Sequence, residues 1–568
     1  MSRRVLLAAL VALAALPVAP AAAQAPFGHP CVPESGVRHC PTADLEQRVP
    51  SFDGTPLDVD VTLPAQGTGP FPLLLLLHGL GGTKTDFLAP TATNPGYDAR
   101  TFARAGYAVV TPTARGFGNS CGRPESRTAG CEDGWTRLAD MRYEVRDLQT
   151  LAGLLVDEGI ARPDRIAATG VSYGGGMATM LAFLKDRIRT PDGLYAPWTS
   201  PRGTPLSLRA AWPRWLWSNG ESIFLRSGRA DAWSRFPTGV PTTAYANGIF
   251  AVAFGGFVAP LGSPLHADLR RWKEQLDDGS LEPSVRPTLD IAYSLHGAAG
   301  VRRPVGGPAP LLLQSGWTDA LFPVGQSLAI RARFPGNVRL QLGDIGHAPA
   351  ANRPGDVALF NEQGREFLKD QLVGGGPRLR RPPVTALPMR CSGQGGGPAF
   401  PGVNVRRTLR FGTERRLRID ARGASSRLAA AVNPLGPTGS HCTRHRADLR
   451  NRAQFSVRSR GVTLLGQPVI TGRVTASGRL GQIAARVWDR DRRTDRQRLI
   501  TRGVFRLKDD ERGRFRFTLD GNAWHFARGH RIVVELLGRD APTYAASPAS
   551  FRASLTDVRV TLPVRRRR

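Results

Sequence analysis

Apart from the N-terminal run, which is too short for a comfortable membrane span, no uninterrupted apolar stretch in the sequence approaches the ~20 residues of a membrane-spanning helix. Neither a C-x-x-C motif nor a cluster of cysteine and histidine is present, so we expect no zinc site, and nothing calls for another metal or a cofactor. Lysine is scarce, occurring only at positions 84, 185, 273, 369 and 508, and no motif of nucleic-acid recognition accompanies the arginines. These absences argue against an integral membrane protein, a zinc protein and a specific nucleic-acid partner.

The basic charge is concentrated late in the chain. The formal net charge is +31, and from residue 401 onward 37 Arg and Lys stand against 13 Asp and Glu, an excess of +24. Such a charge favours association with an anionic cell surface, such as cell-wall polymer or acidic lipid headgroups. A GC-rich genome that replaces lysine by arginine gives the same composition without a function, so both explanations stay open. Residues 565–568 are expected to form a frayed tail rather than a site.

The N-terminus has the composition of an export signal. Residues 1–5 are basic, residues 6–18 are apolar, and three alanines at 21–23 form a small-residue cleavage site. We therefore expect residues 1–23 to be a signal peptide and the mature protein to be secreted. No cysteine follows the cleavage site, which argues against a lipid anchor.

Six cysteines fall into three pairs that are local in the sequence. An even number in an exported chain favours disulfides, and fifteen connectivities are possible for six cysteines. We prefer local pairing among these. The pairs are then Cys31 with Cys40, Cys121 with Cys131, and Cys391 with Cys442.

The most informative segment is Gly170-Val-Ser-Tyr-Gly174. It lies between an apolar strand at 165–169 and a helix-compatible stretch at 177–183, which is the G-x-S-x-G pattern of a nucleophile elbow. The turn is too tight for side chains at Gly170 and Gly174, and it holds Ser172 in a strained conformation with its Oγ projecting outward. The pattern predicts a nucleophilic serine. The alternative is a glycine-rich turn in which Ser172 only caps the following helix.

A nucleophilic serine needs a base and an orienting carboxylate. In folds with this nucleophile elbow, the serine comes first in the chain, then an Asp or Glu, and then the His. The last two residues lie on loops after later strands. Residues 310–315 and 337–342 are predicted to be short buried strands, and they are followed by Asp319 and His347. Both should lie at the sheet edge where Ser172 emerges, so we expect Asp319 to orient His347, the base.

One other carboxylate competes with Asp319. Asp344 lies only three residues before His347 on the same loop. The orienting acid usually follows the strand before the one that leads to the histidine, so we expect Asp344 to be a solvated loop residue.

Two backbone N–H groups are expected to form the oxyanion hole. The apolar run at 71–77 predicts a central parallel strand buried on both faces, and it ends in the glycine-rich loop at 78–82. The N–H groups of Leu80 and Tyr173 would stabilise the oxyanion, and one such donor lowers the barrier by about 2.7–4 kcal/mol. The alternative is that these glycines only make a turn.

The periodicity of apolar residues predicts an α/β fold with a second, all-β part. Strands and helices alternate from residue 71 to about 215, as in a doubly wound parallel sheet, and an alternating segment at 57–63 resembles an edge strand. Residues 216–300 are expected to form a helical cap over the site. Short alternating runs after residue 380 indicate a β-sandwich. We expect an α/β-hydrolase domain at 24–375 (cap at about 216–300) and a sandwich at 380–568.

Several short motifs, in this order, resemble the peptidase S15 / CocE-NonD group of serine hydrolases. They are Arg115-Gly-Phe-Gly-Asn-Ser-Cys-Gly122, Glu144-Val-Arg-Asp147, the elbow, Gly316-Trp-Thr-Asp319 and Gly346-His347. Four later motifs at 485–489, 501–504, 529–532 and 540–542 resemble the jelly-roll domain of that group. The resemblance implies an α/β-hydrolase with a C-terminal jelly roll, and the same triad of Ser172, Asp319 and His347.

The sequence departs from the family at one position. Many members supply an oxyanion donor from a tyrosine hydroxyl in a Pro-Tyr dipeptide after the third strand, where this chain has Leu77-His-Gly-Leu80. A backbone donor from Leu80 must then substitute, and the substrate preference of those members cannot be copied. The sequence also reveals no acidic group that would bind a free substrate amine.

These features predict an exported serine hydrolase that cleaves a small ester or peptide through an acyl-enzyme. One alternative is an Xaa-Pro dipeptidyl-peptidase, and another is a secreted acyltransferase that prefers an alcohol acceptor over water. A third is a wall-binding protein in which the arginine-rich sandwich is active and the hydrolase domain is a scaffold.

Overall fold

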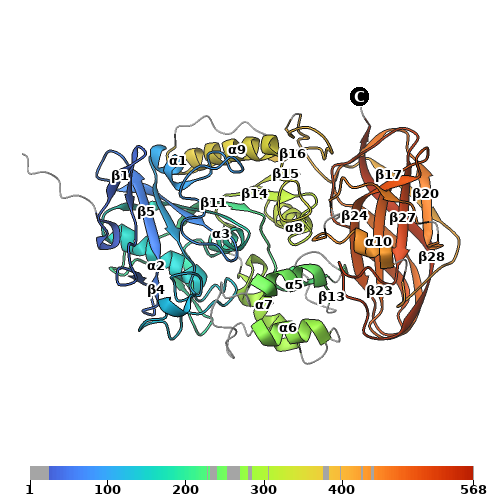
Figure 1. Ribbon diagram of the computed structural model, residues 1–568, viewed down its shortest axis with the longest axis horizontal. Helices are drawn as coiled ribbons and strands as arrows, with labels where there is room; N and C mark the ends of the chain where they lie inside the picture. Colours follow the sequence, from blue (N-terminus) through green and yellow to red (C-terminus); the bar gives the residue numbers. More distant parts are fainter. Residues whose placement is uncertain are drawn as a thin grey trace, which may run out of the picture.

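The computed structural model describes residues 25–566, except 227, 230–238, 253–268, 279–284, 303, 305, 375–382, 397, 424–425, 437–439 and 449. The expected signal peptide and the expected boundary at 375–380 lie outside the described residues. None of the described helices combines the length and apolar character needed to cross a membrane. Figure 1 shows an α/β part, coloured blue to yellow, beside a β-sandwich in orange and red.

A ten-stranded sheet forms the centre of the N-terminal part. Its strand order is β1 (Val32–Glu34), β2 (Val37–Cys40), β5 (Val59–Pro64), β7 (Ala108–Pro112), β6 (Phe71–Leu77), β8 (Ala161–Val171), β11 (Leu208–Arg214), β14 (Leu311–Gly316), β15 (Val338–Gly343) and β16 (Val384–Ala386). The pairs from β7 to β16 are parallel, while β1, β2, β5 and β7 pair antiparallel. The predicted fold class, an α/β sheet followed by antiparallel β-structure, is confirmed.

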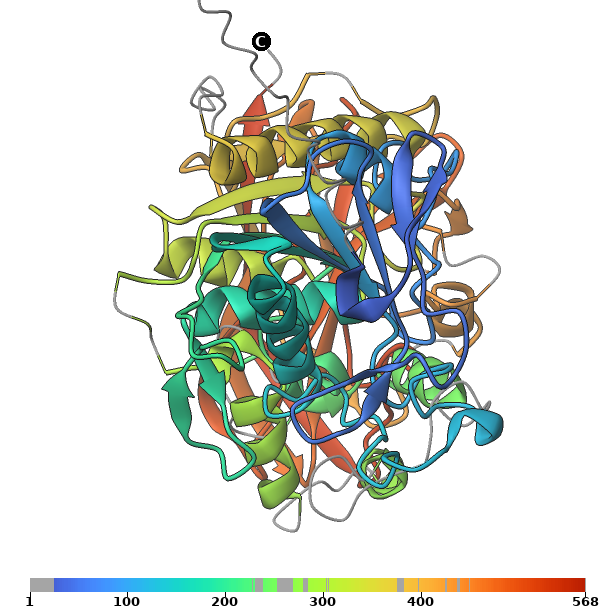
Figure 2. The same ribbon diagram turned by 90° about the vertical axis from the view of Figure 1, so that its left-hand side faces the viewer.

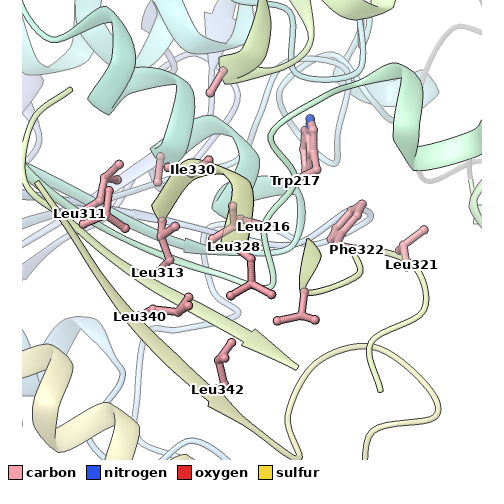
Figure 3. Packing of buried hydrophobic residues seen from close by; sticks show 14 of the residues in the cluster. Leu216, Trp217, Leu311, Leu313, Leu321, Phe322, Leu328, Ile330, Leu340 and Leu342 are labelled. Carbon is pink, nitrogen blue, oxygen red and sulfur yellow. The ribbon is translucent and has the colours of Figure 1, made fainter. Parts of the chain in front are cut away.

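Helices cover both faces of this sheet, which is why its central strands are continuous apolar runs. On one face, α1 (Ala99–Arg104) and α9 (Pro354–Leu372) pack against Leu74 and Leu76 of β6. On the other face, α2 (Glu144–Asp157), α3 (Tyr173–Leu184) and α8 (Gly325–Arg333) pack against Leu73, Leu75 and Leu77. Figure 3 shows part of this second layer, where Leu328 and Ile330 lie near leucines of β14 and β15.

A small helical unit lies between β11 and β14, in the segment where the sequence predicts a cap. It contains α4 (Glu221–Phe224), α5 (Thr243–Val252), α6 (Leu269–Asp278), α7 (Arg286–Leu295) and the strand pair β12 (Leu225–Arg226) and β13 (Val240–Pro241). Phe224, Phe250 and Trp272 contribute to its own hydrophobic core. In Figure 1, α5, α6 and α7 lie below the sheet, on the side of the sandwich.

Two antiparallel sheets make up the C-terminal sandwich. The first contains β25 (Arg512–Thr518), β22 (Val469–Gly478), β28 (Phe551–Arg566), β21 (Val462–Leu464) and β26 (His525–Phe526), and both β17 (Thr408–Thr413) and β18 (Leu417–Asp420) also pair with β28. The second contains β19 (His445–Arg446), β24 (Arg496–Arg506), β23 (Gln482–Asp491), β27 (Arg531–Leu537) and β20 (Gln454–Arg458). Alternate residues such as Ile470, Phe515 and Val534 face inward and are buried. The view in Figure 2 looks along the molecule from the α/β side, with the sandwich behind.

The remaining elements are short. Two hairpins are formed by β3 (Val49–Pro50) with β4 (Pro56–Leu57) and by β9 (Arg187–Arg189) with β10 (Tyr195–Pro197). Helix α10 (Ser426–Ala431) and three single-turn helices (Pro26–Gly28, Pro124–Ser126, Ala298–Gly300) complete the list.

Three disulfides join the same local pairs that the cysteine spacing favours: Cys31–Cys40, Cys121–Cys131 and Cys391–Cys442. The last closes the longest loop, with a sequence separation of 51 residues. It ties the segment that follows β16 to a loop of the sandwich.

Two expectations about polar segments are wrong. The strand at 57–63 is not at the edge, because β5 lies between β2 and β7, and its Asp60 and the preceding Asp58 are buried. Lys84 compensates both carboxylates, with its Nζ 2.7 Å from an oxygen of each. Arg565 is not part of a frayed tail, since it pairs with Thr463 as part of β28 and its guanidinium lies over the ring of Phe400.

Candidate active site

The turn between β8 and α3 has the geometry of a nucleophile elbow. Ser172 has φ 57° and ψ −109°, a region that a residue with a side chain rarely adopts. A Cβ on Gly170 would lie 2.5 Å from the carbonyl carbon of Gly174, and one on Gly174 would lie 2.5 Å from the carbonyl oxygen of Leu77. Only glycine fits at either position, because the turn presses directly against the end of β6.

The structure brings the three predicted triad residues together from the ends of three strands. Ser172 follows β8, Asp319 follows β14 and His347 follows β15. The Nε2 atom of His347 lies 2.8 Å from Ser172 Oγ, and its Nδ1 atom lies 2.8 Å from Asp319 Oδ2. Such a chain of hydrogen bonds lets an imidazole accept the serine proton while a carboxylate fixes its tautomer.

Asp319 is buried, and every acceptor position that it offers is used. Its Oδ2 also accepts the backbone N–H of His347 at 3.1 Å, and its Oδ1 accepts the N–H groups of Leu321 and Phe322 at 3.1 and 2.9 Å. The ring of Phe322 packs edge-on against His347, with centroids 4.9 Å apart. The imidazole is therefore held by a hydrogen bond on one side and by aromatic packing on another.

Asp344 is not a solvated residue as expected. Its side chain is buried, its Oδ2 lies 3.0 Å from Nε of Arg353, and its Oδ1 accepts the N–H of Ala351 at 2.9 Å. Across the interface with the sandwich, His441 Nε2 lies 3.5 Å from the same carboxylate. Asp344 therefore fastens the loop that carries His347 and does not touch the imidazole.

Leu80 and Tyr173, the predicted oxyanion donors, line the same cavity as Ser172. The loop that holds Leu80 is joined to the elbow, because Gly174 N–H donates to the carbonyl oxygen of His78 at 2.9 Å. Within the described part of the chain, neither the Leu80 nor the Tyr173 amide is engaged by a backbone or side-chain acceptor. Both groups are thus available for an oxyanion at Ser172.

A buried carboxylate under the elbow was not identified from the sequence. Glu144 Oε2 accepts the N–H of Asp140 at 3.0 Å, its Oε1 accepts the N–H of Arg137, and the hydroxyl of Tyr173 donates to Oε1 at 3.2 Å. Burial, reinforced by the negative charge of Asp140, raises the pKa of Glu144 to about 7. The Glu-Val-Arg-Asp motif signalled this residue, but its partners come from separate elements.

The cavity above Ser172 has a volume of about 460 Å³ and is almost wholly apolar. The cap contributes Ile223, Phe224, Tyr245 and Trp272 to its wall, and the sandwich contributes Leu435. The sequence of the cap segment is rich in aromatic residues; of these, Trp217 and Phe224 line the cavity, whereas Phe250 is buried in the cap core. Trp233, Phe236, Phe254 and Phe257 lie outside the described residues.

The side chain of His296 joins the cap to the loop under the cavity. Its Nδ1 lies 2.8 Å from the carbonyl oxygen of Leu138, so it donates there, and burial lowers its pKa. Leu138 also lines the cavity and has φ 57°. Tyr245 of the cap donates a hydrogen bond to the carbonyl oxygen of Ala348, next to His347.

One cluster of metal-ligand residues occurs in the described part of the chain: Cys391, His441 and Cys442. Both cysteines are joined in a disulfide, so no thiolate is available to bind a metal. The cluster is therefore structural.

Comparison with known families agrees with the motif resemblance. The model of the X-Pro dipeptidyl-peptidase (S15) family matches residues 53–189, which include the elbow. No curated protein sequence matches the chain.

Solved structures share the fold over nearly the whole chain. A CocE/NonD family hydrolase from Staphylococcus aureus is 13% identical, with 94% of this chain and 97% of that chain covered and a TM-score of 0.57. An α-amino acid ester hydrolase is 14% identical, with coverages of 97% and 100% and a TM-score of 0.56. An aminopeptidase from the marine sediment archaeon Thaumarchaeota archaeon is 13% identical, with coverages of 91% and 95% and a TM-score of 0.56. At these identities the likeness is one of fold.

Proposed function

We propose that Ser172 attacks the carbonyl carbon of an ester or amide, because this chain is a serine hydrolase of the S15/CocE-NonD family. The carrying observation is the hydrogen-bonded chain from Asp319 through His347 to Ser172, with 2.8 Å at both contacts. His347 Nε2 takes the proton of Ser172 as the Oγ–C bond forms, and Asp319 stabilises the imidazolium. The N–H groups of Leu80 and Tyr173 donate to the oxyanion.

Collapse of the tetrahedral intermediate completes the first half of the reaction. His347 returns its proton to the leaving alcohol or amine, and the acyl group stays on Ser172 as an ester. Water then gives a proton to His347 and attacks this ester, and His347 returns that proton to Ser172 Oγ as the acid is released.

The wall of the cavity favours an uncharged substrate with a bulky apolar acyl group. The described residues that line it include no Asp, Glu, Lys or Arg, and the polar groups of their side chains are hydroxyls, imidazoles and indole N–H groups. The free ammonium of an X-Pro dipeptide would lose its hydration there without gaining a counter-charge, which costs several kcal/mol for an unpaired ion. An apolar ester is therefore the better fit.

The protein is further proposed to act outside the cytoplasm. Its N-terminal residues 1–23 have the composition of a signal peptide, and its six cysteines form three disulfides, which persist in oxidising compartments.

A fluorophosphonate probe tests the nucleophile. We expect it to label the wild type and not Ser172→Ala. Labelling of another serine in Ser172→Ala, with hydrolysis retained, would refute the assignment.

A substrate panel tests the acyl preference. p-Nitrophenyl esters of increasing chain length should be hydrolysed, whereas Gly-Pro-p-nitroanilide should release little product. The reverse order would favour the dipeptidyl-peptidase alternative. Mass analysis with an added alcohol distinguishes transfer to the alcohol from hydrolysis.

A further inference from the structure

Eight arginines lie on the outer face of the seven-stranded sheet of the sandwich. All are exposed, and they alternate along their strands with inward residues such as Val474, Phe515 and Leu555, which are buried. We call this set the arginine face: Arg410, Arg418, Arg473, Arg512, Arg514, Arg516, Arg552 and Arg559. It spans five adjoining strands, β25, β22, β28, β17 and β18.

The strand register places like charges side by side on this face. Arg473 of β22 is directly opposite Arg514 of β25, and the neighbouring pairs set Arg516 opposite Thr471 and Arg512 opposite Thr475. Residues opposite each other have Cβ atoms about 4.5–5.5 Å apart, and like charges in this position are destabilising. Folding alone gives no reason for such an arrangement.

Nothing in the described part of the chain neutralises these guanidinium groups. None of the eight lies within ion-pairing distance of a described carboxylate, and the acidic residues closest in register are Asp420, opposite Arg552, and Asp557 of β28. Two arginines of the other sheet differ from these: Arg486 is ion-paired with Asp540 and Glu535, and Arg502 Nη1 lies 3.7 Å from Asp540. The guanidinium groups of the arginine face have no such neutralising carboxylate among the described residues.

We propose that the arginine face binds a flexible linear polymer that carries a phosphate group in each repeat. Neighbouring strands are about 4.7–4.9 Å apart, and alternate residues along a strand about 6.6–6.8 Å, so the face offers a lattice of cations to a chain of closely spaced anions. A phosphate presents oxygens in three dimensions and can accept two arginine forks and a hydroxyl together. The hydroxyls of Thr471 and Thr556 lie opposite Arg516 and Arg473 on the same face.

The side chains of the face argue against two other anionic partners. A membrane-binding surface carries exposed aromatic or large apolar side chains, and single-stranded nucleic acid needs aromatic rings on which bases stack. The exposed large hydrophobics of the described residues are Val32, Leu194, Val373 and Leu435, none of which is on the arginine face. The face therefore offers cations and hydroxyls to an anionic polymer, without apolar or aromatic side chains for a membrane or for stacked bases.

Binding of the full chain to inorganic polyphosphate, measured by fluorescence anisotropy over a range of salt concentrations, tests the proposal. About 0.7 of a counterion is released per phosphate neutralised on a flexible chain, so eight contacts predict a slope of log K against log salt of about −5.6. Arg473→Glu should weaken binding about tenfold and reduce the magnitude of the slope of log K against log salt by about 1–2. Arg123→Glu, the same charge change at an exposed arginine of the α/β part, is the matched control and should have little effect.

A second measurement separates this result from misfolding. Arg473→Glu replaces a like-charge pair with an attractive pair to Arg514, so we expect its melting temperature to rise while its polyphosphate affinity falls. Ester hydrolysis should be unchanged, since Arg473 lies on the outer face of the sandwich.

Three outcomes would overturn the proposal. The first is equal weakening by Arg473→Glu and Arg123→Glu, which would indicate a response to net charge only. The second is tighter binding to phosphatidylglycerol vesicles or duplex DNA than to polyphosphate of equal charge. The third is tighter binding to polygalacturonate, which would assign the face to carboxylate polymers.

Discussion

Asp319→Asn is the most direct test of how the candidate triad works. In the wild type, Asp319 Oδ2 faces the Nδ1 and backbone N–H of His347, and its Oδ1 faces the N–H groups of Leu321 and Phe322. Asparagine offers one oxygen, so its NH2 group must face one of these two pairs of donors. Facing Leu321 and Phe322 would leave two buried N–H groups without an acceptor, at about 1–3 kcal/mol each.

The amide is therefore expected to turn its NH2 group toward His347. The imidazole must then accept at Nδ1 and carry its proton on Nε2, where it cannot take the proton of Ser172. A triad with the wrong tautomer loses about 10⁴-fold in kcat, which corresponds to about 5 kcal/mol of barrier. The loss should appear in kcat rather than in KM, because the apolar cavity is unchanged.

Steady-state and burst kinetics with a p-nitrophenyl ester measure this loss. Asp344→Asn is the matched control, because Asp344 is equally buried on the adjoining loop but contacts Arg353 rather than the imidazole. It should lower the melting temperature and leave kcat within a fewfold. A kcat of Asp319→Asn within tenfold of the wild type, or equal losses in the two variants, would refute the reasoning.

Three other substitutions test the packing and the buried charges. Alanine at Gly174 would place its Cβ 2.5 Å from a backbone oxygen, so we expect a loss of activity and about 1–3 kcal/mol of stability in urea unfolding, whereas Gly336→Ala, with no atom within 4 Å, should change neither. Burial raises the pKa of Glu144 to about 7, above its unfolded value of about 4.3, so the folded state keeps this proton longer. The free energy of unfolding should then fall as pH rises from about 4 to 7, by up to about 3 kcal/mol, and Glu144→Gln should remove this part of the slope in thermal melts; an unchanged slope would contradict the assignment. Arg486→Met would leave the buried Glu535 without a counter-charge and Asp540 with Arg502 only, and it should cost about 3–5 kcal/mol. Arg479→Met at an exposed ion pair should cost less than about 1 kcal/mol, as measured by denaturant unfolding.

The central strands could be predicted closely because they are buried on both faces. The run at 71–77 coincides with β6, and the predictions at 310–315 and 337–342 differ from β14 and β15 by one residue at each end. Such strands are apolar without interruption, so composition alone marks them. Their order predicted that Asp319 and His347 lie on loops at one sheet edge. In the structure, His347 lies 2.8 Å from Asp319 through its Nδ1 atom and 2.8 Å from Ser172 through its Nε2 atom.

The longest strand of the sandwich could not be read from its pattern. In β28 the inward residues are Phe551, Ala553 and Leu555, and then Val558 and Val560, so the alternation changes phase between 555 and 558. A bulge causes this change, because Asp557 has φ 52° and the register with β22 shifts there. A period-2 search sees two short fragments in place of one strand.

Buried charges were the other source of error. Asp58 and Asp60 lie in an alternating polar and apolar segment and Asp344 lies in a loop, and both settings in a sequence indicate exposure, whereas all three residues are buried. Each is buried because a cation reaches it from another segment, Lys84 in the first two cases and Arg353 in the third. Glu144 was also missed as a partner of the elbow because its partner comes from another segment: the hydroxyl of Tyr173 approaches it from a different helix.

The position of β28 in its sheet has a consequence for biosynthesis. Thr408 of β17 pairs with Pro563, about 150 residues later in the chain, and β18, β21 and β22 also need β28 as their neighbour. During translation these strands therefore leave the ribosome with unpaired edges, which stay unpaired until β28 has been synthesised. By then all strands of the parallel sheet upstream have already been synthesised. We expect the nascent sandwich to be the stage at which the chain depends most on chaperones, since unpaired strand edges are templates for aggregation.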